Sequence, residues 1–426
     1  MNKSNPNSLG SKAVLLLAGT LTVMSGIAVS PSLPVMENYF SKVVNTVNIE
    51  ILIRLIITLP ALFIVIGSPI AGVMIDRLGR KPLLLVGIIF YGFAGAAGFL
   101  LNDLISILIG RAFLGLSVAC IIVSSTTLIA DYYMGSARSN FMGLQAAFMG
   151  LAGVIFLPIC GVLASASWRY PFLIYLFSWL LIPLVIFSIY EPHRIQTKEK
   201  ITLKSQVSNN LKIPISLLLM IFGITTFTQI IFYLIPVQLP FYLRGLVNAT
   251  PQQIGNAIAC CNLFSVTASL FYSRLSAKLD FVSILPIIFG LLGTGCSIIG
   301  LVNSYIPVLF GLAIAGLGLG LLIPNMTVWI SAAVPDMIRG RANGGFSTAL
   351  FLGQFLSPIV TQPISLKFGL SSTYIYAGGL LLIFGIIFCV VRTLVFGQLK
   401  NIKSGSSESG ENLSRRLKKM REKKFK

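Results

Sequence analysis

The sequence predicts an all-α membrane protein with twelve transmembrane helices, arranged in two pseudo-symmetric six-helix bundles. Apolar residues make up 55% of the 426 residues and charged residues only 10%, whereas a soluble domain carries about a quarter charged residues. The apolar residues gather in twelve runs, and each is at least as long as the roughly 20 residues that cross a bilayer as a helix. Most Lys and Arg lie in the connections between these runs and after the last one.

The first six spans are expected at 13–34, 51–74, 82–102, 104–128, 140–164 and 171–190. The second six are expected at 213–240, 252–273, 282–303, 306–331, 343–366 and 373–396. The long polar stretch between the two sets predicts an N-terminal bundle over 1–190, a cytoplasmic linker over 191–212, a C-terminal bundle over 213–396 and a basic tail over 397–426. A weak internal repeat, Arg138-x-x-x-x-Gly143 against Arg339-x-x-x-x-Gly344, indicates that the halves share a framework.

The positive charges predict the orientation. If both termini lie on one side of the membrane, every second connection lies on that side too, and together they carry 26 of the 32 Lys and Arg. Cytoplasmic connections carry the excess of Lys and Arg, so both termini are expected in the cytoplasm, in a plasma membrane or bacterial inner membrane. The tail could lie on anionic lipid as an amphipathic helix or be solvated.

Several function classes are disfavoured. The net charge of +20 is spread over short connections and the tail, so a nucleic-acid-binding face is not expected. All six cysteines lie in apolar runs and the one histidine, His193, lies in a polar stretch, so neither a metal site nor a cofactor is expected. No His, Asp or Glu lies at mid-depth of a span, which leaves acid–base catalysis without its residues. A monomeric transporter, not an enzyme, is the expectation.

The connection between spans two and three carries the most specific motif. Residues 72–81 read Gly-x-x-x-Asp-Arg-x-Gly-Arg-Lys, which resembles the loop 2–3 signature of the major facilitator superfamily, in particular of its drug:proton antiporter branch. The resemblance implies the major facilitator fold. It also implies a conformational latch, with Asp76 near the start of span eleven and Asp131 as the acidic partner of Arg80. The latch residues would be Gly72, Asp76, Arg77, Gly79, Arg80 and Asp131. Ordinary positive loop charge is the alternative interpretation.

Arg111 lies about seven residues into span four, roughly 10 Å deep. Ionisable residues at such depth are costly and usually functional. The context Arg111-x-x-x-Gly115-x-x-x-Ala119 resembles the fourth-span motif of proton-driven exporters, whose arginine is implicated in proton coupling. The alternative is an arginine that reaches outward or binds backbone carbonyls. Arg54, four residues after Glu50 near the outer end of span two, is expected to form an interfacial ion pair.

Span five keeps part of an exporter motif. The residues retained are Gly153, Pro158 and Gly161, while Leu157 and Val162 stand where exporters usually have glycine. The retained residues are expected to permit close helix packing.

The sequence therefore predicts a proton-coupled secondary transporter that exports small amphipathic molecules by alternating access. Besides Arg111, candidate coupling or substrate-binding residues are the polar side chains within spans, each of which could instead form an interhelical hydrogen bond: Gln145, Gln229, Tyr233, Asn262, Asn325 and Gln354. The alternative function is a transporter of anionic metabolites or siderophore-like chelates with Arg111 as substrate ligand. The expected partners are a small-molecule substrate, protons and membrane lipids.

Overall fold

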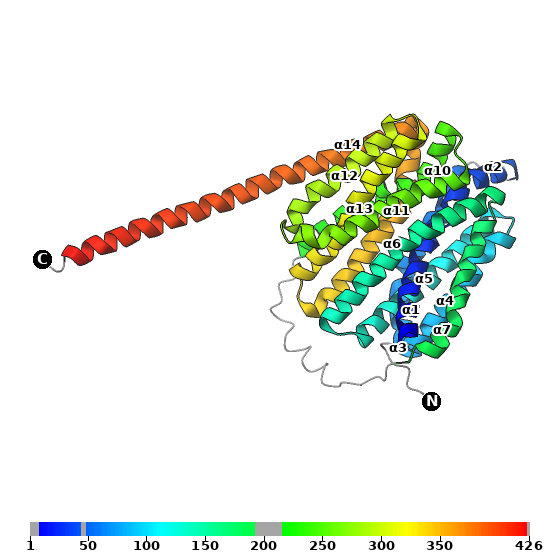
Figure 1. The fold of residues 1–426 in the computed structure, drawn as a ribbon, viewed down its shortest axis with the longest axis horizontal. Helices are drawn as coiled ribbons and strands as arrows, with labels where there is room; N and C mark the ends of the chain where they lie inside the picture. Colours follow the sequence, from blue (N-terminus) through cyan, green and yellow to red (C-terminus); the bar gives the residue numbers. More distant parts are fainter. Residues whose placement is uncertain (1–7, 44–47, 192–214, 424–426) are drawn as a thin grey trace.

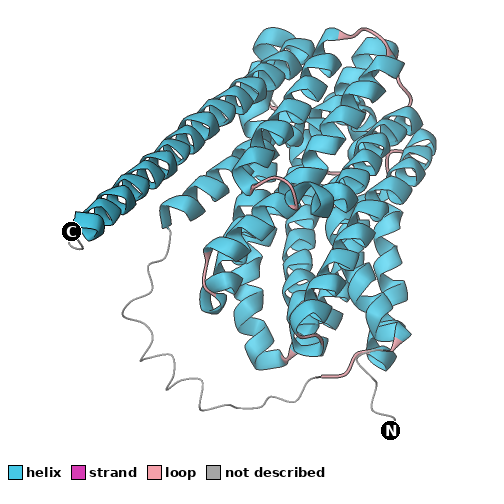
Figure 2. Cartoon of the chain, turned by 60° about the vertical axis from the view of Figure 1, so that its left-hand side comes forward, coloured by secondary structure: helices cyan, strands magenta, loops and turns pink. Residues whose placement is uncertain are grey.

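The computed structural model describes residues 8–43, 48–191 and 215–423, and this part of the chain is helical without strands. The long helices run roughly parallel in one bundle, with the N-terminal half beside the C-terminal half (Figures 1 and 2). The N-terminal half consists of α1 (Leu9–Ile27), η1 (Ser30–Ser32), α2 (Leu33–Val43), α3 (Ile49–Leu78), α4 (Arg80–Leu100), α5 (Leu104–Tyr132), α6 (Gly135–Ala166), η2 (Tyr170–Leu180) and α7 (Leu181–Ser188). The C-terminal half consists of α9 (Ile215–Phe232), α10 (Leu234–Val247), α11 (Pro251–Ser276), α12 (Phe281–Leu301), α13 (Tyr305–Ala333) and α14 (Asp336–Lys423).

The predicted number of spans is confirmed. Eleven stretches of the described chain are long and apolar enough to cross a membrane. The last of them, Ile338–Val390, is 53 residues long and is interrupted at Gly369, which has a φ of 84°. Glycine adopts such positive φ angles at little cost, so this stretch is two spans joined by a one-residue turn.

Three spans differ from the straight α-helices that apolar length predicts. The sixth begins as the 3-10 helix η2 and continues as α7, and the first and seventh spans are broken. The first is broken between α1 and α2 at η1, which contains Pro31. The seventh is broken at Tyr233, between α9 and α10, three residues before Pro236. Proline has no backbone N–H and is tolerated best in the first turn of a helix, which is where Pro31 and Pro236 stand.

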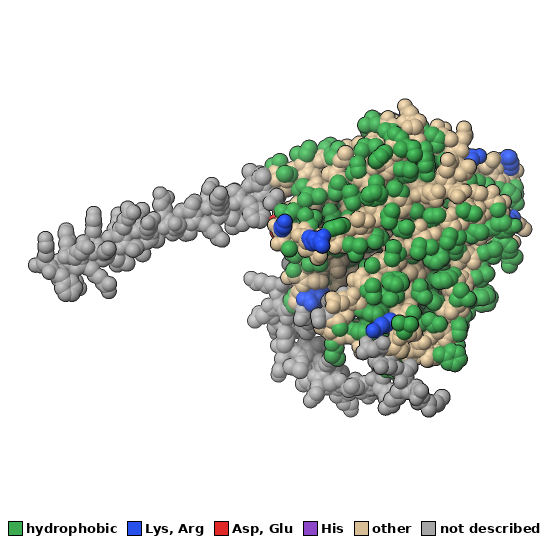
Figure 3. Space-filling view, in the orientation of Figure 1, with side chains coloured by type: hydrophobic (Ala, Val, Ile, Leu, Met, Phe, Trp, Pro, Cys, Tyr) green, Lys and Arg blue, Asp and Glu red, His purple; other side chains and the backbone are tan. Residues whose placement is uncertain are grey.

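Each half is built around its own large apolar cluster, although Tyr233 and Val237 join the N-terminal cluster and Leu157 joins the C-terminal one. Within the N-terminal half, α5 packs closely on α3, because a Cβ added at Gly115 would lie 2.4 Å from the carbonyl oxygen of Pro60. Large apolar side chains such as Phe90 and Phe310 are exposed on the outer wall, which is mostly hydrophobic in Figure 3. Lipid solvates such a surface well.

We call the side on which α1 begins and α7 ends the terminal side. The connections 100–104 and 301–305 lie on the other side, which we call the opposite side. The predicted linker, apart from Glu191, lies outside the described residues. The helix α14 ends at Lys423, and the side chains of the basic tail also lie outside the described part. Its lipid contact therefore stays a prediction.

Candidate functional site

A cavity of about 340 Å³ lies between the two halves. Its walls come from α1, α3, α5 and α6 on one side and from α9, α10, α11, α13 and α14 on the other. Most lining side chains are apolar, and the described residues that line it include no Asp, Glu, Lys, Arg or His. A larger hollow of about 520 Å³ lies within the C-terminal half, between α11, α12 and α13. Of these two hollows in the described part of the chain, the smaller is the one lined by both halves.

Four of the predicted candidates line the shared cavity: Gln145, Tyr233, Asn262 and Gln354. The amide of Gln145 donates to the carbonyl oxygen of Leu15 over 2.8 Å, and the amide of Asn262 donates to that of Ile258 over 3.0 Å. These bonds fix the orientation of both amides at the cavity wall. Tyr233 lies at the break of span seven, where its ring reaches the cavity from between α9 and α10.

Two other candidates lie elsewhere. Asn325 is fully buried, accepts from the Tyr272 hydroxyl over 3.3 Å and donates to the Phe281 carbonyl over 3.1 Å, which ties α13 to α11 and α12. Gln229 is buried but does not line the cavity. Hydroxyl residues that the sequence reasoning missed also line it, namely Thr22, Ser25, Ser125, Thr126 and Ser347. The run of Ser and Thr over 124–127 was the available signal for two of them.

Arg111 lies behind the cavity wall and is only 1% exposed. Its Nε donates to the carbonyl oxygen of Ile56 over 2.9 Å, and its Nη2 donates to the hydroxyl of Tyr175 over 2.9 Å. The guanidinium also lies over the rings of Phe172 and Tyr175, at 5.3 and 5.0 Å from the ring centres. In this state Arg111 does not line the cavity.

The bond to Ile56 has a cause in the sequence. Pro60 lies four residues later in α3, and because proline has no N–H it leaves the Ile56 carbonyl without its helical donor. A buried carbonyl without a donor costs about 1–3 kcal/mol. Arg111 supplies that donor from α5, so the arginine stabilises the proline-containing segment of α3, whose Ile57 and Pro60 line the cavity.

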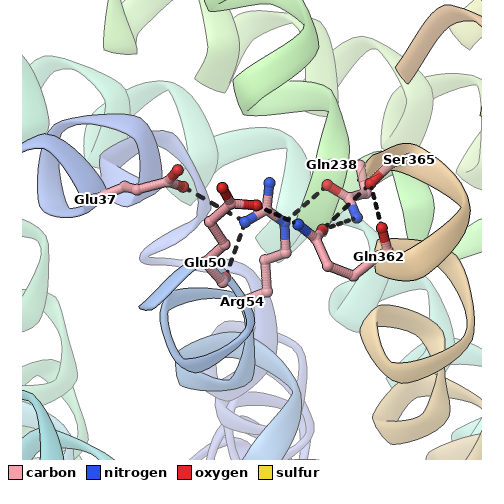
Figure 4. A network of polar contacts seen from close by, with 6 residues as sticks. All are labelled: Glu37, Glu50, Arg54, Gln238, Gln362 and Ser365. Carbon is pink, nitrogen blue, oxygen red and sulfur yellow. Dashed lines mark hydrogen bonds and ion pairs between the residues drawn. The ribbon is translucent and has the colours of Figure 1, made fainter. Parts of the chain in front are cut away.

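A polar network closes the two halves against each other on the opposite side (Figure 4). Arg54 of α3 donates through Nε to the Gln238 side chain of α10 over 2.8 Å. Gln238 in turn donates to Gln362 of α14 over 2.8 Å, and Gln362 donates to the carboxylate of Glu50 of α3 over 2.7 Å. The chain of bonds therefore leaves the N-terminal half at Arg54, crosses the C-terminal half and returns at Glu50.

Arg54 pairs with a different carboxylate from the one expected. Its Nη1 lies 3.4 Å from a carboxylate oxygen of Glu37, and it donates to the backbone carbonyl of Glu50 over 2.8 Å. The expected ion pair with Glu50 was wrong, because the break at η1 directs α2 so that Glu37 reaches Arg54, while the Glu50 carboxylate points to Gln362. The guanidinium also lies 4.1 Å from the ring centre of Phe241.

At the terminal side, the described contacts of Arg80 and Lys81 lie within the N-terminal half. The expected contact between Arg80 and Asp131 is present, with Nε 3.0 Å from the carboxylate. The carboxylate of Glu191 accepts from the backbone N–H groups of Arg80 and Lys81 over 2.8 and 2.7 Å. A carboxylate is favourable at a helix N-terminus, so Glu191 caps α4. Sequence reasoning had assigned it to the linker.

Gly79 makes this cap possible. Its φ is 94°, and a Cβ there would lie 2.8 Å from a Glu191 carboxylate oxygen. Asp76 and Arg77 are exposed in the last turn of α3. Among the described atoms, none lies within 4 Å of a Cβ built at Gly72 or Gly344, so at these two positions α3 and α14 are not packed closely.

Span five packs across the interface between the halves. A Cβ at Gly153 would lie 2.9 Å from the Asn262 side chain, and one at Gly161 would lie 2.8 Å from the carbonyl oxygen of Pro251, both on α11. Where exporters usually have glycine, Leu157 presents its backbone carbonyl to Gly255 of α11, at 2.5 Å from the built Cβ. The close approach of α6 and α11 is therefore made possible by Gly255 of α11 and not by a glycine at position 157. Pro158 lies inside α6.

Comparison with known proteins gives consistent matches. The sequence model of the Major Facilitator Superfamily matches residues 15–247 and 222–422. The chain is 26% identical over 314 residues to the quinolone resistance protein NorA of Staphylococcus aureus, covering 70% of this chain and 77% of that protein. It is 25% identical over 303 residues to multidrug resistance protein 1 of Bacillus subtilis, covering 69% and 76%.

Solved structures share the fold. The D-xylose–proton symporter superposes with a TM-score of 0.76 at 15% identity, covering 89% of this chain and 96% of that one. The human organic anion transporter MFSD10 superposes with a TM-score of 0.66 at 17% identity, covering 90% of this chain and 100% of that one. At such low identity these structures bear on architecture alone.

Proposed function

Since the chain belongs to the major facilitator superfamily, and is therefore a multi-pass membrane transporter and not an enzyme, we propose that it exports small amphipathic molecules in exchange for protons by alternating access. The observation that carries this proposal is the cavity shared by the two halves. Its walls are apolar with a few amides and hydroxyls, which suits molecules with an apolar body and one or two polar groups. The curated relatives are named for quinolone and multidrug resistance, which supports export.

The bound substrate carries no net charge in this proposal. An ion in an apolar site needs a partner of opposite charge, and the described lining residues provide none. The rival function, transport of anions on Arg111, requires that arginine to reach the cavity. Instead it binds Ile56 and Tyr175 behind the wall, so the geometry favours uncharged substrates.

The orientation proposed from the positive charges places both termini in the cytoplasm. The network of Arg54, Gln238 and Gln362 then closes the cavity toward the outside. In the same proposal the motif loop is a latch that stabilises the outward-facing state, where Asp76 would approach the start of span eleven.

Uptake into everted vesicles tests the transport proposal. Uncharged amphipathic dyes should accumulate when a proton gradient is imposed, while permanently cationic and anionic analogues should not. Phe351→Trp, which fills the cavity, should abolish uptake, and Phe310→Trp on the exposed face of α13 should leave it intact. Uptake of an anion that is lost on substitution of Arg111 would instead establish the rival function.

The latch has a separate test. Asp76→Asn should reduce transport strongly and leave expression and dye binding largely intact, because only the outward-facing state loses stabilisation. Full transport by this variant would exclude the latch.

A further inference from the structure

The opposite-side network contains two carboxylates and one guanidinium, and therefore carries one net negative charge. Arg54 has a side chain that is only 5% exposed, and that of its partner Glu37 is 25% exposed. A buried charge without compensation is costly, and Arg54 balances only one of the two carboxylates. One proton makes the whole network neutral.

The two carboxylates differ in what they hold together. Glu37 pairs with Arg54, and both residues belong to the N-terminal half. Glu50 accepts from Gln362 on α14, so its carboxylate joins the two halves directly (Figure 4). A hydrogen bond to an ionised carboxylate is about twice as strong as a bond between neutral groups. Protonation of Glu50 would therefore weaken a contact between halves, whereas protonation of Glu37 would weaken a contact within one half.

The two sites for the proton affect these contacts differently. With the proton on Glu37, the guanidinium of Arg54 loses its ion pair at 3.4 Å. With the proton on Glu50, that ion pair stays and the bond from Arg54 to the Glu50 backbone carbonyl also stays. Protonation of Glu50 therefore keeps the ion pair of Arg54 and acts only on the contact between the halves.

We propose that Glu50 is the proton acceptor of an outer gate: one proton taken up from the outer solution weakens its bond to Gln362 and lets the two halves separate on that side. The proposal deepens the proposed function and rests on it for the orientation. It assigns a proton-binding role to a carboxylate at the membrane surface, in a chain whose spans carry no acid at mid-depth. When Glu50 releases the proton back to the outer solution, the bond to Gln362 regains its charge and the gate closes. The gate proton is therefore not the proton that is exchanged for substrate.

Other ionisable groups on the four elements of the gate are directed elsewhere. Lys42 of α2 is exposed. Arg244 of α10 donates to the Ala249 carbonyl over 3.4 Å, and Lys367 of α14 lies 5.2 Å from the ring centre of Phe368. Tyr242 donates to the Ile299 carbonyl, and the ring of Tyr39 packs on Phe40 and Trp168. The charge balance of the gate is therefore set by Glu37, Glu50 and Arg54.

Distances between spin labels on the purified full-length protein test the gate without any substrate. Labels on cysteines introduced at Val43 and Leu366, in a background without the native cysteines, report the separation of the halves, because both positions are exposed and one lies on each half. Labels at Val43 and Leu100 lie on one half and serve as the control pair. The pH of the solution is varied between about 8 and about 5.

Acidification should lengthen the Val43–Leu366 distance and leave the Val43–Leu100 distance unchanged. The ratio of open to closed molecules should rise by at most about tenfold for each pH unit, because one proton is bound. Glu50→Gln should be open at both pH values, and Glu37→Gln should still respond to pH. Asp103→Asn, which changes an exposed carboxylate outside the gate, should behave as the unmodified protein.

A Glu50→Gln variant that keeps the full pH response, or an unmodified protein whose distance does not change, would overturn the proposal. If Glu50→Gln folds poorly, Gln362→Leu removes the other partner of the same bond and should also be open at both pH values. A gate that opens with acid in a protein that transports no dye would refute the proposed function and leave the gate intact. Proton-driven transport by a protein whose gate does not respond to pH would refute the gate and leave the proposed function intact.

Discussion

The described charged contacts around the start of α4 and those around Arg54 join different parts of the molecule. At the terminal side, Arg80 with Asp131 and Glu191 with the start of α4 connect elements of one half. At the opposite side, Arg54 and Glu50 connect α3 to α10 and α14 of the other half. Charged contacts within a half hold a rigid unit together, whereas contacts between halves select among arrangements of two rigid units. Contacts within a half should therefore determine stability, and contacts between halves should determine the conformational state.

The largest effect on stability is expected at Arg111, whose contacts lie within one half. Arg111→Leu leaves the Ile56 carbonyl and the Tyr175 hydroxyl without their donor, which should lower the free energy of unfolding by about 3 kcal/mol. Thermal unfolding in detergent measures the loss, and the distance across the outer gate should not change. In a Pro60→Ala background the helical N–H is restored, so the same substitution should cost less. An equal cost in both backgrounds would contradict the role assigned to Pro60.

Gly79→Ala should have the next largest effect. A non-glycine residue at a φ of 94° is strained by about 1–3 kcal/mol, and the new methyl group also meets the Glu191 carboxylate. Gly135 also has a positive φ, of 55°, but a Cβ there meets no described atom within 4 Å. Gly135→Ala is therefore the control for a positive φ, and the difference in unfolding temperature between the two variants measures the Glu191 contact together with the greater backbone strain at Gly79. Equal losses would show that the cap on α4 contributes nothing.

Gln238→Leu should change the state and not the stability. The substitution removes the acceptor of Arg54 Nε and the donor to Gln362, which should favour separation of the halves by about 1–2 kcal/mol, or roughly tenfold in population. Spin-label distances across the gate measure this shift. Gln229→Leu, a buried glutamine of the same span outside the network, should leave the distances unchanged. A large fall in unfolding temperature without a change of distance would contradict the view that contacts between halves determine the conformational state and not the stability.

The smallest effect on stability is expected at Asp131. Its ion pair with Arg80 is partly exposed, with side chains 29% and 19% accessible, and such pairs contribute at most about 1 kcal/mol. Asp131→Asn should therefore hardly change the unfolding temperature in detergent. A loss as large as that of Arg111→Leu would show that the terminal-side contacts are central to the fold and that the two sides were compared wrongly.

The spans could be predicted because an apolar run of about 20 residues has few alternatives to a transmembrane helix. The Arg80–Asp131 contact could be predicted from the family motif, since its loop and the end of span four meet at one surface. The network that joins Arg54, Gln238, Gln362 and Glu50 could not be predicted. Glu50 and Gln362 are 312 residues apart in the sequence, and no periodicity relates them.

Two residues show why local rules were insufficient at the site. Spacing of four residues along a helix favoured Glu50 as the partner of Arg54, but the break at η1 brought Glu37 closer. The alternative interpretation of Arg111, that it binds a backbone carbonyl, agrees with the structure. Pro60 was the signal for it, because a proline within a buried helix always leaves a carbonyl that needs a donor.

The uncharged lining of the cavity has a consequence for the energetics of transport. If a molecule without charge leaves the cell and one proton enters, each cycle moves one positive charge inward. The membrane potential then drives export directly, with about 2.3 kcal/mol for every 100 mV, even when the pH is equal on both sides. Export in intact cells at matched internal and external pH should accordingly stop when valinomycin and potassium collapse the potential.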